Sequence, residues 1–189
     1  MRQCGRVRNG QLFWISQSVR PVRDRGGHVI ESRSMVIDIS ERKQAEAELI
    51  QAKEAWERTF NAVPDLIMIL DNEYQIIRAN KAVTDKLGCT EEELVGLSCF
   101  KAVSGTEEPP QYCPNVRLLA DGLEHSAEVH ENHLGGDFLV PVSPPRNVDG
   151  TLIGSVHVAR DITERRQMEE ALRKSRDELE RRVEERTAD

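Results

Sequence analysis

The sequence of 189 residues lacks long hydrophobic runs and has no signal-peptide pattern at its start. Its longest apolar runs, such as Leu66 to Leu70, are far shorter than the roughly 20 consecutive apolar residues that a membrane-spanning helix needs. The four cysteines form no CxxC pair, which indicates reduced thiols rather than a disulfide scaffold; they are Cys4, Cys89, Cys99 and Cys113. We therefore expect a cytoplasmic protein with no membrane contact within these residues.

Aromatic residues and positive charge are also scarce. Aromatic residues make up 4% of the chain, and 26 lysines and arginines face 33 acidic residues, for a net charge of -7 at pH 7. A general nucleic-acid-binding protein needs a basic face to neutralise phosphates, so no nucleic-acid partner is expected. The sequence contains no Gly-rich ATP loop and no phosphoacceptor histidine in a helical context. The chain itself is therefore predicted not to be an enzyme.

An internal repeat organises the chain. The segment Asp38-Ile-Ser-Glu-Arg42 recurs as Asp161-Ile-Thr-Glu-Arg165, and Gly27 recurs as Gly150, each at an offset of 123 residues (161 minus 38). An ungapped match across strand, turn and helix indicates one structural unit that is used twice.

In each copy an apolar run is followed by a long helix. Asp38 and Asp161 are predicted N-caps, and the Glu three residues later completes a capping-box-like pattern. One face of each helix carries an apolar stripe with spacings of 4, 3, 4 and 4; the stripes are Ala45, Leu49, Ala52, Trp56 and Phe60, and Met168, Leu172, Ser175, Leu179 and Val183. Such a narrow stripe on a charged helix favours a coiled-coil homodimer through both helices, the alternative being a surface helix packed on its own domain.

The residues between these helices predict a complete cycle of short elements. Asn80 is expected to cap a helix that ends at Gly88, and Thr90 and Glu93 to form a capping box. The expected elements are strands at 66–71 and 74–79, helices at 80–87, from Thr90 to Gly96 and at 113–121, and strands at 125–133, 137–143 and 151–160. This order predicts an α+β fold with a five-stranded antiparallel sheet, short helices on one face and long flanking helices.

At this point the residues resemble a PAS domain, the small sensory module of bacterial signalling proteins. The motifs that carry the resemblance are Pro64-Asp65, Ile77-Arg-Ala-Asn80, Leu87-Gly-Cys-Thr-Glu-Glu-Glu-Leu-Val-Gly96, Pro144 with Asp149-Gly150, and Asp161-Ile-Thr-Glu-Arg165. Residues 6–42 resemble only the last strands of a preceding PAS domain. The last residues, from Leu179 onward, resemble the linker that leads into the phosphoacceptor domain of many sensor histidine kinases.

The resemblance implies four segments. Residues 1–40 are expected to be the C-terminal strands of a truncated PAS domain, and residues 41–62 a linker or signalling helix. Residues 63–162 are expected to form a complete PAS domain, and residues 163–189 a C-terminal coiled-coil signalling helix. The parent protein is expected to be a multi-PAS sensor histidine kinase.

Two motifs suggest chemistry that the neighbouring residues do not support. Gly135-Gly-Asp137-Phe138 is similar to the GGDEF hairpin of diguanylate cyclases, but the Glu is absent and a Gly-Gly turn explains the pattern. Cys99 lies near the adduct-forming cysteine of flavin-binding LOV domains, but Phe100-Lys-Ala-Val103 replaces their flavin-contacting residues. Flavin and haem are therefore judged unlikely, and the cofactor is unknown.

Cys99 and Cys113 are also similar to part of a cysteine cluster in some kinase-associated PAS domains. Pro110 stands where the middle cysteine would fall, and two thiolates cannot close a tetrahedral metal site. His125, His130 and His133 fall on a predicted exposed hairpin. We therefore predict no metal site and keep Cys99 and Cys113 as a possible redox pair, the alternative being small buried side chains.

The sequence thus predicts a sensory and dimerisation module that relays a signal to a C-terminal output domain, a histidine kinase of a two-component system. The expected relay residues are Asp161, Ile162, Thr163, Glu164 and Arg165. A small-molecule ligand is expected in a pocket lined by Ile69, Ile77, Val83, Leu87, Phe100, Leu119, Phe138, Val140 and Val158, although these residues could equally be core. The alternatives are a ligand-free structural relay, or the PAS module of a diguanylate cyclase, chemoreceptor or transcriptional regulator.

Overall fold

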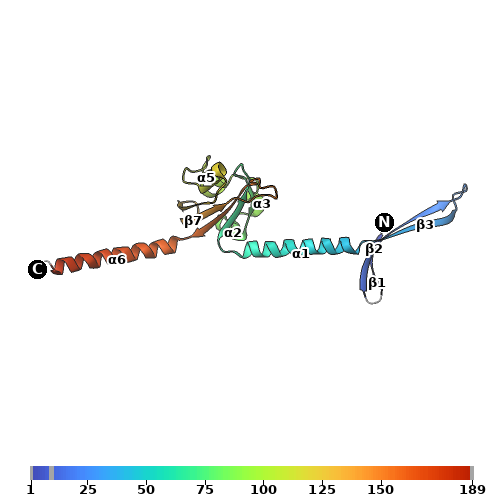
Figure 1. Cartoon of the computed structure of the whole chain (residues 1–189), viewed down its shortest axis with the longest axis horizontal. Helices are drawn as coiled ribbons and strands as arrows, with labels where there is room; N and C mark the ends of the chain where they lie inside the picture. The colour runs from blue at the N-terminus through green and yellow to red at the C-terminus, as the bar shows by residue number, and fades with distance from the viewer. Residues whose placement is uncertain (1, 9–10, 188–189) are drawn as a thin grey trace. The chain divides into compact units, whose positions relative to one another are not determined.

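A computed structural model describes residues 2–8 and 11–187, and the chain forms two units, Met1–Arg58 and Thr59–Asp189 (Figure 1). In the first unit, β1 (Arg2–Arg8), β2 (Gln11–Arg23) and β3 (Val29–Asp38) pair antiparallel in that order. Helix α1 (Ser40–Ala62) follows β3, and every residue of β3 is exposed. Strand β3 therefore contributes no buried side chain to a core.

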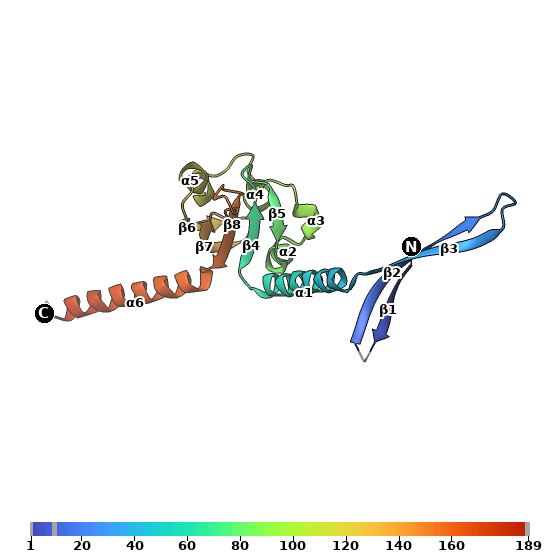
Figure 2. The same ribbon diagram turned by 45° about the vertical axis from the view of Figure 1, so that its right-hand side comes forward.

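The second unit is built on a five-stranded antiparallel sheet (Figure 2). Its strands are β4 (Leu66–Leu70), β5 (Ile76–Ala79), β6 (His125–Glu131), β7 (Gly136–Ser143) and β8 (Ser155–Asp161). The order across the sheet is β5-β4-β8-β7-β6, so the first and last strands of the domain meet at its centre. The predicted α+β fold with a five-stranded antiparallel sheet is confirmed.

Five helices belong to this unit: α2 (Lys81–Leu87), α3 (Glu91–Leu94), α4 (Cys99–Ser104), α5 (Pro114–Asp121) and α6 (Thr163–Thr187). The Asn80 cap, the Thr90 capping box and the left-handed Gly88 are all present as predicted. Helix α4 is an addition that the sequence pattern did not predict. Among the described residues, no helix combines the length and the apolar character needed to span a membrane.

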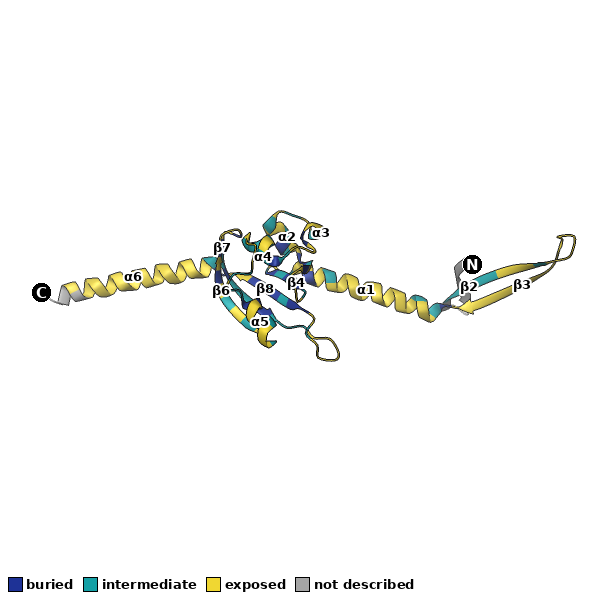
Figure 3. Ribbon diagram, turned by 90° about the horizontal axis from the view of Figure 1, so that it is seen from above, coloured by how far each residue is buried: buried dark blue, intermediate teal, exposed yellow. Residues whose placement is uncertain are grey.

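The core forms on one face of the sheet, where side chains from α2, α3 and α4 meet the inward residues of the strands. Val83, Leu94 and Cys99 pack with Met68 and Phe138 in one buried cluster. Figure 3 shows the contrast between the buried strands and the largely exposed α6. The helix therefore draws little stability from its own domain beyond its first turns.

The internal repeat is confirmed in three dimensions. Strands β6, β7 and β8 with α6 repeat β1, β2 and β3 with α1, and both ends of β6 lie 123 residues after those of β1. The pairing register differs by two residues, because Arg2 pairs with Gln17 whereas His125 pairs with Val142. In both copies the residue after the last strand donates its N–H to the middle strand, Ile39 to the Trp14 carbonyl and Ile162 to the Asp137 carbonyl, each at 2.8 Å. The two copies therefore share the same strand-to-helix junction.

The start of α6 differs in detail from the prediction. Asp161 belongs to β8, and its Oδ1 accepts a hydrogen bond from the Thr163 N–H at 2.9 Å. The Thr163 hydroxyl accepts one from the Asp137 N–H, also at 2.9 Å. The Asp161 carboxylate thus accepts the first N–H of α6, whereas the Thr163 hydroxyl bonds to the sheet and takes no part in capping the helix.

Asn80 connects the start of the domain to its second strand. Its side chain is fully buried, and Oδ1 accepts hydrogen bonds from the N–H groups of Ile67 and Val83 at 3.0 and 3.2 Å. Its Nδ2 donates to the carbonyls of Val63 and Asp65 at 3.2 and 2.9 Å. A single amide thus satisfies backbone groups of the entry loop, β4 and α2.

We predict that Asn80→Ala lowers the free energy of unfolding by about 3 kcal/mol, because it leaves several buried backbone groups without partners. Asn132→Ala is the matched control, since Asn132 is exposed, and its change should stay below about 0.5 kcal/mol. Urea unfolding followed by circular dichroism measures both values. Equal stability of the two variants would contradict the role given to Asn80.

Candidate functional site

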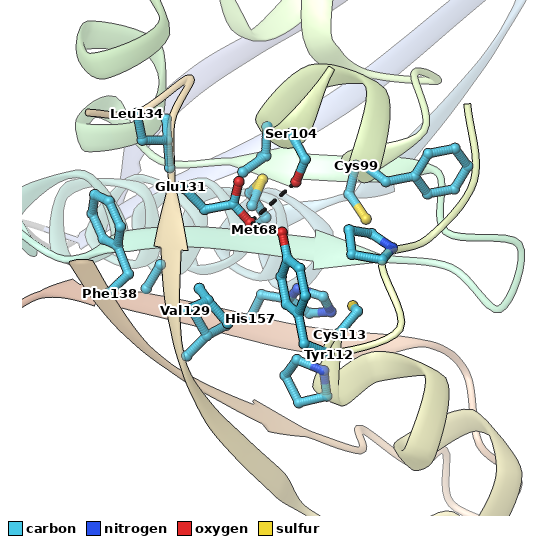
Figure 4. Close-up of a pocket in the computed structure, with 16 residues that line it drawn as sticks. Met68, Cys99, Ser104, Tyr112, Cys113, Val129, Glu131, Leu134, Phe138 and His157 are labelled. Atoms are coloured by element: carbon cyan, nitrogen blue, oxygen red, sulfur yellow. Dashed lines mark hydrogen bonds between the residues drawn. The ribbon is translucent and has the colours of Figure 1, made fainter. Parts of the chain in front are cut away.

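A cavity of about 70 Å³ lies between the inner face of the sheet and the segment from α4 to the start of α5 (Figure 4). Its lining is Met68, Cys99, Phe100, Val103, Ser104, Pro110, Tyr112, Cys113, Pro114, Val129, Glu131, Leu134, Phe138, Val140, His157 and Ala159. Pockets for drug-sized ligands measure about 300 to 1,000 Å³, and an apolar cavity of about 150 Å³ holds benzene. In the form seen here, the cavity fits only a very small molecule.

Three polar groups meet in this otherwise apolar cavity. Glu131 ends β6 with only 8% of its surface exposed, and its Oε1 lies 3.2 Å from both the Ser104 hydroxyl and the Tyr112 hydroxyl. A carboxylate only accepts hydrogen bonds, so both hydroxyls donate. Burial, and next the charge of Glu131, raise the pKa of Tyr112, which keeps its phenol proton available for that bond.

His157 lies on the floor of the cavity and is almost fully buried. Burial lowers the pKa of His157 to about 4, so the imidazole is neutral at pH 7. Its Nε2 lies 3.1 Å from the Ser155 hydroxyl, which satisfies one ring nitrogen. The histidine therefore contributes a polar but uncharged wall.

Cys99 and Cys113 both line the cavity (Figure 4). Burial raises the pKa of Cys99 to about 12, and burial also raises the pKa of Cys113. Because the thiolate is the reactive form, both residues are held as unreactive thiols at neutral pH. The redox role of this pair stays a prediction, and the burial of both sulfurs weighs against it.

The arrangement of sheet and helices agrees with comparisons to known proteins. The family model described as PAS fold matches residues 60–167, which is more than half of the chain, and a model described as PAS domain matches residues 5–41. The chain belongs to the PAS family. The PAS domain of an HTR-like protein from Haloarcula marismortui has the same fold, with a TM-score of 0.50 and 18% identity over 64% of this chain and 99% of that one.

Two curated relatives are much longer than this chain. Sporulation kinase E of Bacillus subtilis (strain 168) is 28% identical over 149 residues, which cover 78% of this chain and 20% of the relative. The probable diguanylate cyclase DgcE of Escherichia coli (strain K12) is 26% identical over 166 residues, 82% of this chain and 15% of the relative. The chain thus spans a fifth or less of either relative, and what it shares with them is a PAS sensory region.

Only three of the residues predicted to line the pocket of the PAS domain do so, namely Phe100, Phe138 and Val140. Val83 is buried in the core, and Leu87 packs against it. Ile77 is 44% exposed. The remaining predicted residues, Ile69, Leu119 and Val158, are half-buried and do not line the cavity.

The misplacement on β4 and β8 has a simple physical cause. Successive side chains of a strand point to opposite faces, so a choice that is wrong by one residue selects the wrong face of the whole strand. On β8 the valines lie on the outer face, whereas Ser155 and His157 are buried on the inner face. The usual rule that apolar residues point inward therefore fails on this strand.

The predicted relay residues lie where β8 becomes α6. The Arg165 and Arg166 guanidinium groups each lie 2.8 Å from the Glu128 carboxylate, and Arg166 also lies 3.0 Å from Asp137. Their hydrogen bonds, that of Arg166 first, lower the pKa of Glu128. The first turn of α6 is thus fastened to β6 and β7, the two strands that carry Glu131, Phe138 and Val140 into the cavity.

Sequence reasoning missed the polar residues of the cavity, Glu131, Tyr112, Ser104 and His157. A signal for Glu131 was present, because Ala127, Val129 and Glu131 share one face of β6 and the first two are apolar. His125 and His130 were considered instead, and each lies beside a surface carboxylate, Asp121 and Asp137 respectively. Across the described residues, no group of three or more His, Cys, Asp or Glu side chains is placed to hold a metal ion.

The neutral state of His157 predicts a pH dependence of stability. In the unfolded chain this imidazole is protonated near pH 6.5, whereas in the folded PAS domain its pKa of about 4 keeps it neutral down to that pH. The unfolded state therefore binds more protons between these values. The contribution of His157 is complete above pH 6.5 and falls as the pH drops toward 4, by on the order of 3 kcal/mol at most.

Urea unfolding at pH 7, 6 and 5 measures how steeply the free energy of unfolding falls with falling pH, which is the pH slope of stability. We expect His157→Gln to lose it, and the exposed control His133→Gln to keep it. A His157→Gln variant with the full pH slope of the original protein would contradict the assignment.

Proposed function

We propose that the chain is a sensory and dimerisation module that relays a signal from the PAS cavity to a C-terminal output domain. The observation that carries the proposal is the shared use of β6 and β7. Glu131 faces the cavity three residues after Glu128, which holds Arg165 and Arg166 of α6. A ligand that shifts β6 or β7 would therefore move the base of the helix.

The junction is built to transmit such a shift. The Ile162 N–H, the Thr163 hydroxyl and the Arg166 guanidinium all bond to Asp137 of β7. The ion pairs are partly exposed and individually weak, but together they fix the direction in which α6 leaves the sheet. A ligand changes output only through its different affinity for the two arrangements of this junction.

The output domain is proposed from the curated relatives. We favour a histidine kinase of a two-component system, since a sporulation kinase is among the relatives, with the chain itself non-catalytic and cytoplasmic. The proposed segments are the C-terminal strands of a truncated PAS domain (1–40), a linker helix (41–62), a complete PAS domain (63–162) and a signalling helix (163–189). A diguanylate cyclase parent is the second candidate, because DgcE is also a relative.

A second role for the module itself, that of a ligand-free structural relay, is favoured by one observation. The cavity of about 70 Å³ is small enough to be a packing defect rather than a site. In that case the module would pass on signals from other domains through the same junction.

The dimer is proposed to form through the stripes on α1 and α6. Leu49 of α1 is 72% exposed, and on α6 Met168, Leu172 and Leu179 are 59%, 72% and 58% exposed. A second copy of the chain fits these stripes because the partner helix offers the same apolar spacing with charges on both sides. The neighbouring ion pairs on α6, such as Glu170 with Lys174, keep the opposite face solvated.

We expect the chain to sediment as a dimer at micromolar concentration, and Leu172→Glu to shift it to a monomer by burying a charge in the seam. Arg173→Glu introduces the same residue outside the stripe, about 100° around α6 from Leu172, and should leave the dimer intact. Analytical ultracentrifugation distinguishes the two species. A monomeric original chain, or a dimer that tolerates Leu172→Glu, would contradict this part of the proposal.

The relay itself is tested in a chimera that joins this chain to a histidine kinase core. Val103 lines the cavity, so Val103→Phe fills it, at a cost of about 1 to 3 kcal/mol in stability. We expect this change to alter autophosphorylation several-fold, and Asp161→Ala to cancel the difference by releasing the Thr163 N–H at the junction.

The double-mutant cycle provides the control, because two independent sites give additive effects. Circular dichroism confirms that each variant is folded. If Val103→Phe has the same effect with and without Asp161→Ala, the junction does not carry the signal.

A further inference from the structure

Glu131 is the one acidic side chain that is buried within the described part of the chain. Its Oε1 takes the hydrogen bonds from Ser104 and Tyr112, but no lysine or arginine in that part forms an ion pair with it. Two partly covered carboxylates do have such partners: Asp65 is paired with Arg160 and Glu91 with Arg78. A buried carboxylate without a cation is costly unless something else supplies the positive charge.

No residue of the cavity supplies that charge. The lining contains no lysine or arginine, and burial holds His157 neutral by lowering its pKa to about 4. The other contacts are apolar side chains and the rings of Phe100, Tyr112 and Phe138, whose electron-rich faces attract cations rather than anions. Charge and surface chemistry therefore favour one class of occupant.

We propose that the cavity binds a small organic cation, a short alkylamine whose ammonium group is held by the Glu131 carboxylate. This rests on the proposed sensory function and names the class of its ligand. The carboxylate is already oriented, because Ser104 and Tyr112 both donate to Oε1 and leave the second oxygen for the ligand. Figure 4 shows the three side chains pointing toward one another at the cavity wall.

The size of the cavity limits the alkyl part. A volume of about 70 Å³ is roughly half of the cavity that holds benzene, so the ligand has on the order of three to five non-hydrogen atoms. Its apolar part would contact Met68, Val103 and Val129, and the Tyr112 ring lies at the partly exposed side. Propylamine is a suitable probe, because it is protonated at pH 7 and has four non-hydrogen atoms.

The position of Glu131 connects this site to the junction. Glu131 and Glu128 lie on the same strand, and Glu128 binds Arg165 and Arg166 of α6. Placing a positive charge against Glu131 would draw the end of β6 toward the cavity. The amine would thereby act on the strand that fastens the signalling helix.

The test is a titration of the full chain with propylamine, 1-propanol and propionate, followed by the NMR signals of the methyl groups of Met68, Val103 and Val129. We expect saturable shifts with propylamine and at least tenfold weaker binding of 1-propanol, with no binding of propionate. Glu131→Gln should weaken propylamine binding at least tenfold. The exposed control Glu124→Gln removes the same charge outside the cavity and should leave binding unchanged.

Three results would overturn the amine assignment: 1-propanol binds as well as propylamine, Glu131→Gln binds propylamine unchanged, or none of the three compounds shifts the cavity methyl groups. If Glu131→Gln does not fold, the comparison of propylamine with 1-propanol in the original chain decides alone. The sensory proposal fails separately, because the cycle of Val103→Phe and Asp161→Ala uses no ligand.

Discussion

The position of α6 relative to the sheet depends on one backbone contact, the hydrogen bond from the Ile162 N–H to the Asp137 carbonyl at 2.8 Å. It joins the end of β8 to the start of β7, and it sets the point at which the chain leaves the sheet and becomes α6. Thr163 and Arg166 add side-chain bonds to Asp137. These contacts to β7 therefore hold the first turn of α6 against the sheet.

The same backbone hydrogen bond occurs in the first unit, where the Ile39 N–H donates to the Trp14 carbonyl. The Ser40 hydroxyl accepts from the Trp14 N–H and so takes the place of Thr163. The ion pair between Arg166 and Asp137 has no counterpart in the first unit, because Trp14 occupies the position that corresponds to Asp137. The shared part of the junction is thus backbone geometry and a hydroxyl. The part that could respond to charge in the cavity belongs to the second copy alone.

The cavity and the junction share two strands, β6 and β7. The inner face of these strands carries Glu131, Phe138 and Val140 to the cavity, while Glu128 and Asp137 meet the arginines of α6. Strict alternation of side chains along a strand makes this double use possible. It is also the basis of the relay that we propose between the cavity and α6.

Much of the fold follows from the sequence alone. Local signals determine the Asn80 cap, the Thr90 capping box and the left-handed Gly88, since each depends on residues a few positions apart. The repeat likewise predicts that a strand passes directly into a long helix in each copy. These features need only neighbouring residues, so the pattern was sufficient to predict them.

Only the tertiary structure decided the lining of the cavity. In β4 every residue is apolar, so no alternation marks the inner face, and in β8 the inward residues include Ser155 and His157. Ser155 and His157 lie two residues apart on β8, and the hydrogen bond between them, at 3.1 Å, offsets the cost of burying both. Glu131, in contrast, meets Ser104 and Tyr112 from distant parts of the sequence. Side-chain pairing across the fold, which no local pattern records, therefore determines the chemistry of the site.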